Sequence, residues 1–309
     1  TEEGSDYLEA AMTQDSELIK NEFADLYVDH DIPSKKILEQ IRKNIRIKKL
    51  KRVCFRVAAV LIPVVLIVGL YIQLNSKVDL FGTSEYEEVV VDKGERIQIM
   101  FQDGTKVYIN SDSKLRYPKK FALNTREVYL EGEAYFVVAK NKNRPFIVNL
   151  SGPAIHVLGT SFNVSAYKDE SMIETTLVEG SVKLNVVSGG KRMTQMLKPN
   201  EKAEYQKGAG KIKVFGVNTE YDTAWKNGEI IFRNHPMDKV LKTLERHYHV
   251  VFEVKDNEIL KSIITARFKD EQLPQVLEYL KLASGIQYAI HKPTVKDSGS
   301  GTSVVEISK

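Results

Sequence analysis

The amino-acid sequence predicts a single-pass membrane protein with a short α-helical segment on one side of the membrane and two folded domains on the other. Three observations lead to this prediction. One long apolar run begins about fifty residues into a chain of 309. Positive charge flanks that run on one side only, and after it the hydrophobic period changes from helical to alternating. The first folded domain should be all-β, and the second should be a small α+β domain.

The transmembrane helix is expected at residues 53–74. Within this range Arg56 is the only charged residue, and from Val57 to Ile72 the only polar side-chain group is the phenol of Tyr71. About twenty helical residues span about 30 Å, which matches a hydrocarbon core, and the long side chain of Arg56 can reach the interface. A buried core helix would show a polar stripe, and a cleaved signal peptide would lie nearer the start, so both alternatives fit less well.

Charge gives the orientation of this helix. Residues 42–56 hold eight Lys or Arg and no acid, whereas residues 75–89 hold one Lys and four carboxylates. The positive-inside rule therefore places the N-terminal side in the cytoplasm and about 235 residues on the other side. This position explains the basic cluster without nucleic acid, and the formal charge of +4 is too small to argue for a nucleic-acid partner. Residues 75–84 are expected to be a linker.

The cytoplasmic segment, residues 1–52, shows apolar faces at helical spacing before and after Pro33. Such a short segment cannot bury much apolar surface by itself, so the faces predict docking on a partner protein. A small self-contained helical hairpin is the alternative. The expected partner-binding residues are Phe23, Leu26, Tyr27, Ile37, Ile41 and Ile45.

Alternating apolar residues predict an all-β domain at residues 85–187. The stretch "GERIQIMFQDGTKVYIN" predicts a hairpin that turns at Asp103-Gly104, and "REVYLEGEAYFVV" predicts a second hairpin that turns at Glu131-Gly132. Further short strands follow at "RPFIVNL", "AIHVLGT", "SFNVSAY", "IETTLVEG" and "SVKLNVV". The pattern fits a sandwich, a roll or a barrel-like module equally well.

Residues 188–224 are expected to be a connector with some β-like residues, and residues 225–309 a small α+β domain. Within that domain the same pattern of strand, helix and strand occurs twice, thirty-six residues apart, which predicts two βαβ units. The matched pairs are Phe232 with Phe268, Met237 with Leu273, Val240 with Val276, Leu241 with Leu277, Leu244 with Leu280, and Val250 with Ile286. "SVVEIS" near the end is a possible last strand.

The sequence offers little for enzymatic chemistry. Cys54 is the only cysteine, so no intramolecular disulfide and no Cys-His pair in a folded domain is expected. His247 and His249 have the spacing of a metal-binding strand but more simply end a helix whose core includes Tyr248. Glu131 and Glu133 could imitate a carboxylate pair, yet alternation assigns them to the solvent face. We expect no enzyme, no cofactor and no metal.

The quoted stretches of the all-β domain, together with "HVLGTSFNV" and "TLVEGSV", resemble the periplasmic domain of the FecR family of sigma-factor regulators. "NGEIIFRNHPMDKVLKTLERHYHV" is similar to the C-terminal domain of family members from Bacteroidetes, which resembles the short N-terminal domain of secretins and TonB-dependent receptors. The resemblance covers about two thirds of the chain. The chain departs from the family at its short N-terminal segment, which contains no Trp.

The resemblance implies an anti-sigma factor in the inner membrane, with its C-terminus in the periplasm. Its partners would be an extracytoplasmic-function sigma factor on the cytoplasmic side and the signalling domain of a TonB-dependent outer-membrane receptor on the periplasmic side. The alternative is a membrane-anchored module that binds an envelope glycan or protein.

In several relatives the Gly-Thr step that matches Gly159-Thr160 is a self-cleavage point. The hydroxyl of Thr160 could attack the carbonyl of Gly159 and convert the amide into an ester that water hydrolyses, with His156 as a candidate base. Alternatively, Gly159 marks a bulge or a close crossing of strands, and Thr160 is simply a β-former.

Overall fold

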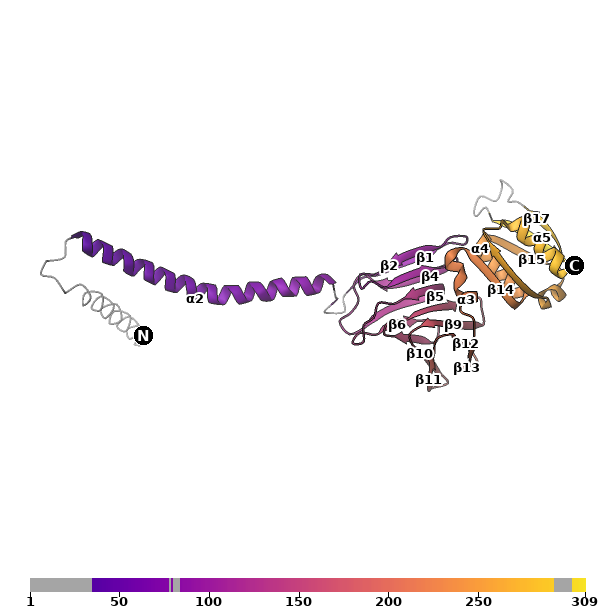
Figure 1. Ribbon diagram of the computed structural model, residues 1–309, viewed down its shortest axis with the longest axis horizontal. Coiled ribbons are helices and arrows are strands. Elements are labelled where there is room, and N and C mark those ends of the chain that lie inside the picture. Colours follow the sequence, from indigo (N-terminus) through magenta and orange to yellow (C-terminus); the bar gives the residue numbers. More distant parts are fainter. Residues whose placement is uncertain (1–34, 78, 80–83, 292–301) are drawn as a thin grey trace. The chain divides into compact units, whose positions relative to one another are not determined.

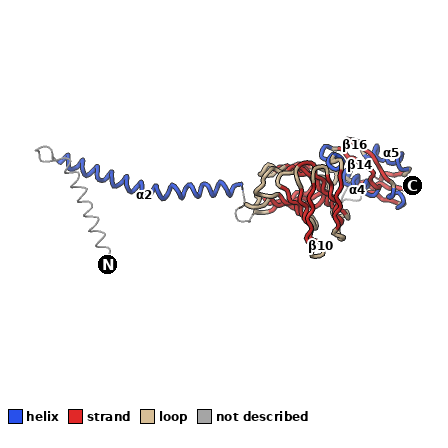
Figure 2. Tube along the Cα trace, turned by 60° about the horizontal axis from the view of Figure 1, so that its bottom comes forward, coloured by secondary structure: helices blue, strands red, loops and turns tan. Residues whose placement is uncertain are grey.

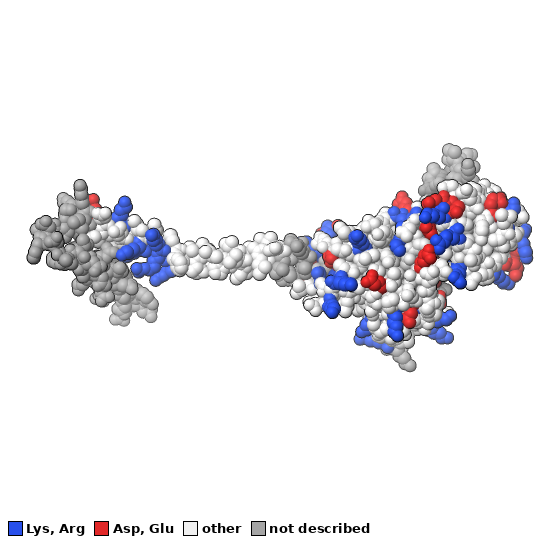
Figure 3. Space-filling view, viewed as in Figure 1, with Lys and Arg blue, Asp and Glu red and all other residues white. Residues whose placement is uncertain are grey.

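The computed structural model describes residues 35–77, 79, 84–291 and 302–309, and the chain divides into two compact units, Thr1–Gln73 and Leu74–Lys309. Helix α2 (Lys35–Lys77) runs without a break through the predicted span and accommodates Pro63 (Figure 1). Within it, Glu39–Gln73 is long and apolar enough to cross a membrane. Figure 3 shows the middle of this helix free of charge, with basic side chains gathered on its N-terminal side.

Thirteen strands form one folded sheet in the second unit (Figures 1 and 2). They are β1 (Tyr86–Val91), β2 (Ile97–Met100), β3 (Lys106–Ile109), β4 (Ser113–Pro118), β5 (Arg126–Val137), β6 (Phe146–Asn149), β7 (Ala154–Val157), β8 (Ser161–Ala166), β9 (Met172–Glu179), β10 (Val182–Ser188), β11 (Lys191–Leu197), β12 (Glu201–Gln206) and β13 (Lys211–Gly216). The predicted hairpin at residues 97–109 is confirmed as the β2–β3 pair.

Strand β5 belongs to both halves of this sheet. Its first half pairs with β4 and β6, and its second half pairs with β3 and β8. One half therefore has the order β1-β4-β5-β6-β7-β10-β11 and the other β2-β3-β5-β8-β9-β12-β13. Side chains from both halves, including Leu115, Phe136 and Phe162, form a single buried core, so the domain is a sandwich whose two layers share one strand.

The predicted turn at Glu131-Gly132 is wrong, because β5 continues through it for 12 residues. Gly132 has φ +103°, and a Cβ on it would lie 2.3 Å from the Oγ of Ser113 and 2.6 Å from its Cα. Glycine is required here because the chain bends and another strand crosses its backbone closely. The residue therefore marks the place where β5 passes from one layer to the other.

The segment expected to be a connector contributes more to the β domain than anticipated. Strands β11, β12 and β13 lie within residues 188–224 and form the outer strands of the two halves. Two short helices follow, α3 (Glu220–Thr223) and the 3₁₀ helix η1 (Ala224–Asn227). They carry Asp222 and Trp225 to the junction with the C-terminal domain.

The C-terminal domain shows the predicted order of strand, helix and strand twice, but the two strands of each unit lie in different sheets, so neither unit is a βαβ crossover within one sheet. The two units are β14 (Glu229–Pro236), α4 (Met237–Tyr248) and β15 (Val250–Val254), then β16 (Ile263–Lys269), α5 (Leu273–Ser284) and β17 (Gln287–His291). The 3₁₀ helix η2 (Asn257–Lys261) links them, and β18 (Ser303–Ser308) confirms the last predicted strand. Strand β14 pairs with β16, and β18 lies between β15 and β17.

The internal repeat is confirmed by packing. Of the six matched pairs, five are buried at both positions, and in the remaining pair Met237 is buried while Leu273 packs against the same core from its edge. Helix α5 begins with a capping box made by Gln272 and Gln275, and it ends at Gly285 with φ +74°. This core shares no residue with the core of the β domain.

Candidate functional site

The structure covers the predicted partner-binding faces only in part. Phe23, Leu26 and Tyr27 lie outside the described residues. Ile37 falls within α2; along that helix Ile41 is 8% exposed and Ile45 is half-buried. The binding role of these residues stays a prediction.

The Gly159-Thr160 step is closely packed. Gly159 has φ +154°, and a Cβ on it would lie 2.5 Å from the Cγ of Lys140 and 2.7 Å from its Cα. Thr160 is 4% exposed, and its hydroxyl donates to the carbonyl of Ser181 at 2.9 Å. A Cβ on Gly180 would lie 3.0 Å from the carbonyl oxygen of Gly159. The close crossing explains the glycine by itself, and the hydroxyl meets a carbonyl rather than a base.

His156 lies on β7 and lines the same surface groove as Gly159 and Thr160. Burial and the neighbouring Lys183 lower the pKa of His156, so the imidazole is mostly neutral at neutral pH. A neutral imidazole can accept a proton. The structure gives no hydrogen bond between His156 and Thr160 among the described residues, so a base role requires a rearrangement.

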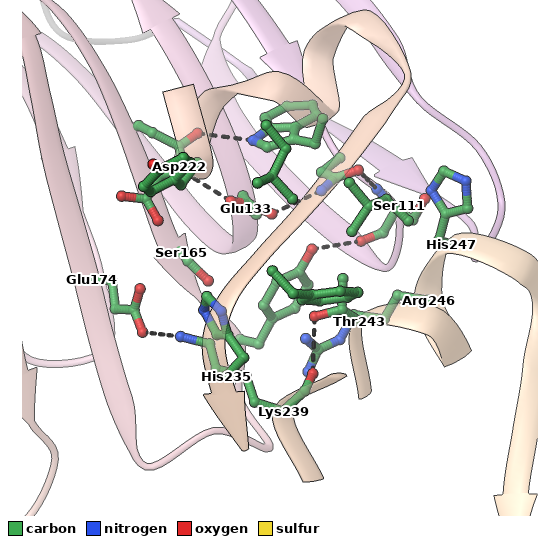
Figure 4. A pocket seen from close by; sticks show the side chains of 18 of the residues that line it. Ser111, Glu133, Ser165, Glu174, Asp222, His235, Lys239, Thr243, Arg246 and His247 are labelled. Carbon is green, nitrogen blue, oxygen red and sulfur yellow. Dashed lines mark hydrogen bonds and ion pairs between the residues drawn. The ribbon is translucent and has the colours of Figure 1, made fainter. Parts of the chain in front are cut away.

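A second candidate site is the junction between the β domain and the C-terminal domain, which encloses a cavity of about 100 Å³ (Figure 4). Strands β5, β8 and β9 supply one wall, and β14 and α4 supply the other. The cavity is large enough for several water molecules. Acidic, basic and imidazole side chains meet in it, and sequence reasoning did not bring these residues together.

Glu133 points into this cavity, so its predicted place on the solvent face is wrong. Its Oε2 accepts a hydrogen bond from Nδ2 of Asn110 at 2.7 Å, and its Oε1 accepts one from Nδ2 of Asn163 at 2.8 Å. The Oδ1 of Asn163 in turn accepts from the indole of Trp225 at 3.1 Å. No cation pairs with Glu133 among the described residues. Burial therefore raises its pKa to about 7, although both hydrogen bonds oppose the shift.

Lys202 on β12 joins three elements beside the cavity. Its ammonium lies 3.0 Å from Oε2 of Glu174 on β9 and 2.6 Å from Oδ1 of Asp222 on α3. The other oxygen of Glu174 pairs with Lys239 on α4, as Figure 4 shows. Burial alone would raise the pKa of Glu174, but Lys202 and Lys239 lower it to about 2. Burial alone would lower the pKa of Lys202, but the carboxylates of Asp222 and Glu174 raise it. With these pKa values, Glu174 and Lys202 stay charged throughout the physiological range.

Arg246 on α4 makes a second set of ion pairs between the C-terminal domain and the β domain. Its Nη2 donates to both oxygens of Asp169 at 2.8 and 2.9 Å, and its Nη1 lies 2.5 Å from Oε1 of Glu170. The guanidinium carbon stands 3.6 Å from the ring centre of Tyr167. Only 7% of the Arg246 side chain is exposed. A planar, bidentate guanidinium stacked on an aromatic ring fixes the orientation of α4 against the β domain.

Two histidines complete the cavity wall. Burial, with Lys239 and Lys202 nearby, lowers the pKa of His235 to about 4, and burial with Arg96 nearby lowers that of His247 to about 4. The prediction that the His247–His249 stretch ends a helix is confirmed, since α4 ends at Tyr248 and His249 has φ +53°. No cluster of three potential metal ligands occurs in the part of the chain that the structure describes.

Comparison with known proteins decides the family. Residues 87–183 match the model described as FecR protein, and residues 229–296 match the model described as FecR, C-terminal. The chain belongs to the FecR family of sigma-factor regulators. The cavity thus lies where the two domains that define this FecR chain meet.

Solved structures agree with this assignment. The crystal structure of a candidate anti-sigma factor from Parabacteroides distasonis ATCC 8503 at 1.65 Å resolution is 28% identical, with a TM-score of 0.64, and the match covers 72% of the FecR chain and 99% of that chain. A second structure, at 2.50 Å resolution and with the same description, matches with the same identity and TM-score over 73% and 100% of the two chains. No curated protein gave a match.

Proposed function

We propose that the chain is a single-pass anti-sigma factor of the inner membrane. In this proposal residues 1–52 hold an extracytoplasmic-function sigma factor in the cytoplasm. The periplasmic part senses the signalling domain of a TonB-dependent outer-membrane transporter. The observation that carries the proposal is the presence, in one chain, of the two FecR domains and of one helix, the only such helix in the described part of the chain, that is long and apolar enough to span a membrane.

The topology can be tested with a reporter enzyme that is active only in the periplasm. Fused after Lys309 it should be active, and fused before Arg42 it should be inactive, because the basic side of the helix stays in the cytoplasm. The reverse result would overturn the proposal, since both partner assignments depend on this orientation.

Partner binding can be tested by substitution on the apolar faces of the cytoplasmic segment. Phe23→Asp or Ile41→Asp should abolish co-purification of the sigma factor and leave membrane insertion intact. Gln40→Asp on the exposed side of α2 is the matched control and should retain binding. If the double variant still binds tightly, the faces pack on each other and the partner uses another surface. Retention of an envelope glycan in place of a sigma factor would favour the scaffold alternative.

The inferred role needs no enzymatic turnover, but a single self-cleavage at Gly159-Thr160 is part of the proposal. The hydroxyl oxygen of Thr160 would bond to the carbonyl carbon of Gly159 while the amide C–N bond breaks and the nitrogen takes a proton. Water would then hydrolyse the ester, giving a Gly159 carboxylate and a free N-terminal Thr160. The glycine supports the proposal because it has no side chain to shield its carbonyl carbon from the attacking hydroxyl.

A denaturing gel of the chain expressed in its own host tests the cleavage. Fragments of residues 1–159 and 160–309 should appear, and Thr160→Ala should keep the chain whole. Thr160→Ser is the matched control, since it keeps the hydroxyl and should still cleave. An intact wild-type chain would show that Gly159 serves only the close strand crossing.

A further inference from the structure

We propose that the face of the β domain formed by β6, β7, β10 and β11 binds an extended acidic peptide segment. The segment would add to the open edge of β11 and place apolar side chains in the neighbouring groove. This inference is independent of the sigma-factor and transporter assignments, because it uses only the surface of the β domain.

The first observation is a one-sided charge distribution. Residues 139–161 and 182–200 together hold seven Lys or Arg and no Asp or Glu, in a chain with 41 acidic residues. These two segments include β6, β7, β10 and β11, which are neighbours in one half of the sheet. The fold thus brings together two stretches without acids that are separated by twenty residues in the sequence.

The second observation is a groove of about 710 Å³ within this face. Its size is in the range of ligand sites. It is lined by basic side chains, by apolar side chains and by no carboxylate; the residues that matter most are Lys140, Lys142, Lys183, Leu158 and Met196. Leu158 is 47% exposed and Met196 is 51% exposed, so apolar surface is open to water between the lysines. Such surface favours a partner with apolar side chains flanked by negative charge.

The groove is built on a rigid frame. Lys183 is in register with Met196 on one side and with His156 on the other, so these three side chains form a row across adjacent strands. The loop that carries Lys140 and Lys142 is held at both ends by the buried Arg126, which donates to the carbonyl of Ala139 at 2.9 Å and to that of Arg144 at 2.9 Å. A preorganised surface lowers the entropy cost of binding.

The third observation selects a peptide over other anions. Strand β11 pairs with β10 alone among the described strands, so one row of its backbone groups is open. An extended peptide can pair with this edge, whereas a polysaccharide or a lipid surface cannot. The edge strand β11 begins with Lys191 and Arg192, and basic residues on an edge strand protect against aggregation because they repel a second copy of the same edge. An acidic peptide that pairs with β11 would be attracted by these positive charges and not repelled. Met196 lies on β11 and also lines the groove, so a peptide on this edge would be next to the groove.

The test uses the full chain in detergent and a fluorescent seven-residue peptide that alternates Glu and Leu. Fluorescence anisotropy should show saturable binding. Lys142→Glu with Lys183→Glu should weaken the affinity at least about tenfold, since two exposed attractions become repulsions. Lys106→Glu with Lys211→Glu changes the net charge equally, but on β3 and β13, and should leave the affinity within about twofold because distant charges are screened.

Two further probes separate the possible sources of binding. A peptide with N-methyl groups on alternate amides should bind much more weakly, because it cannot pair with β11. Lys142→Met with Lys183→Met keeps the apolar stems and should fold normally while losing affinity. The proposal is overturned if the wild-type chain shows no saturable binding, if both charge-reversal variants weaken it equally, or if N-methylation has no effect. It is also overturned if polygalacturonate or phosphatidylglycerol vesicles require the groove lysines and the peptide does not.

Discussion

The junction and the groove use the same kinds of side chain in opposite ways. At the junction, Lys202 and Arg246 are almost fully buried; Lys202 pairs with two carboxylates and Arg246 with three. In the groove, Lys142 and Lys183 are exposed and line a surface without a carboxylate. Paired, buried charges hold two domains in one orientation, whereas unpaired, exposed charges do little for the fold and are available to a partner. The position of the carboxylates distinguishes a structural site from a binding site.

Lys202→Met should produce the largest effect. The substitution keeps most of the side-chain volume but leaves Glu174 and Asp222 without their shared cation, and breaking a buried pair in this way costs about 3 to 5 kcal/mol. The free energy of unfolding should therefore fall by about that amount. Trp225, the only Trp in the chain, lies at the junction, so its fluorescence during urea unfolding is the natural measurement.

A triple variant checks the explanation. Adding Glu174→Gln and Asp222→Asn to Lys202→Met removes the uncompensated charges and should recover a large part of the loss. If Lys202→Met alone costs less than about 1 kcal/mol, the junction charges are solvated and do not hold the domains together.

Glu133→Gln should produce the next largest effect, and only at high pH. Because the pKa of Glu133 is about 7 in the folded protein and 4.5 ordinarily, the folded state binds the extra proton between these values. The contribution of Glu133 to the free energy of unfolding is therefore fully present below about pH 4.5 and is lost as the pH rises through about 7. Gln stays neutral at every pH, although its NH2 group faces one of the two Asn donors, so the stability of the variant relative to wild type should rise by about 2 to 3 kcal/mol between about pH 4.5 and pH 8.

The pH dependence is measured as the difference in the free energy of unfolding between Glu133→Gln and wild type. His235 and His247 have lowered pKa values, so their contribution to stability rises with pH from about 4 to 6.5, opposite to that of Glu133. This contribution is common to both proteins and cancels in the difference. A difference that does not change between about pH 5 and pH 8 would mean that water or a cation stabilises the Glu133 carboxylate.

Thr160→Ala should have a smaller effect on stability. It removes the buried hydroxyl that donates to Ser181, and such a bond contributes about 1 kcal/mol. Thr160→Ser keeps the bond and should lose only the packing of the methyl group, so the two variants, compared as uncleaved chains, should differ by about 1 kcal/mol in urea unfolding. Equal stability would show that the carbonyl of Ser181 finds another donor.

Lys183→Met should have the smallest effect. The lysine is exposed and pairs with no carboxylate of the described residues, so the free energy of unfolding should stay within about 0.5 kcal/mol of wild type. This is the same substitution as Lys202→Met in a neighbouring part of the same domain. A loss as large as that of Lys202→Met would remove the distinction between the junction and the groove.

The sequence predicted the features that depend on local period. Residues 53–74 are apolar enough for a span, the β2–β3 hairpin follows from alternation on both sides of Asp103-Gly104, and the repeat at an offset of thirty-six predicted the core of the C-terminal domain. One signal in the sequence was misread. The apolar side chains at Val128, Leu130, Ala134 and Phe136 keep one phase across Gly132, whereas a two-residue turn would shift that phase by one. The unbroken alternation predicts the single long β5 that the structure shows.

The cavity could not be predicted in the same way. Glu133 contacts Asn110 and Asn163, which lie 23 and 30 residues away, and Trp225 lies 62 residues from Asn163. Alternation shows only that Glu133 faces away from the apolar core of its own sheet. Whether that outer face meets water or another domain depends on how α4 packs against the β domain, which no local pattern encodes.

The central position of β18 has a consequence for the order of events during biogenesis. Strands β15 and β17 pair with β18 and not with each other, so both lack a partner until residues 303–308 have emerged. The second buried core includes Val305 and Ile307, so it also stays incomplete until then. At about 5 to 20 residues per second, synthesis of the roughly fifty residues from β15 to β18 leaves β15 unpaired for several seconds. During that interval the domain exposes strand edges that a chaperone could cover, and a chain truncated before residue 303 would keep them exposed and reach quality-control proteases.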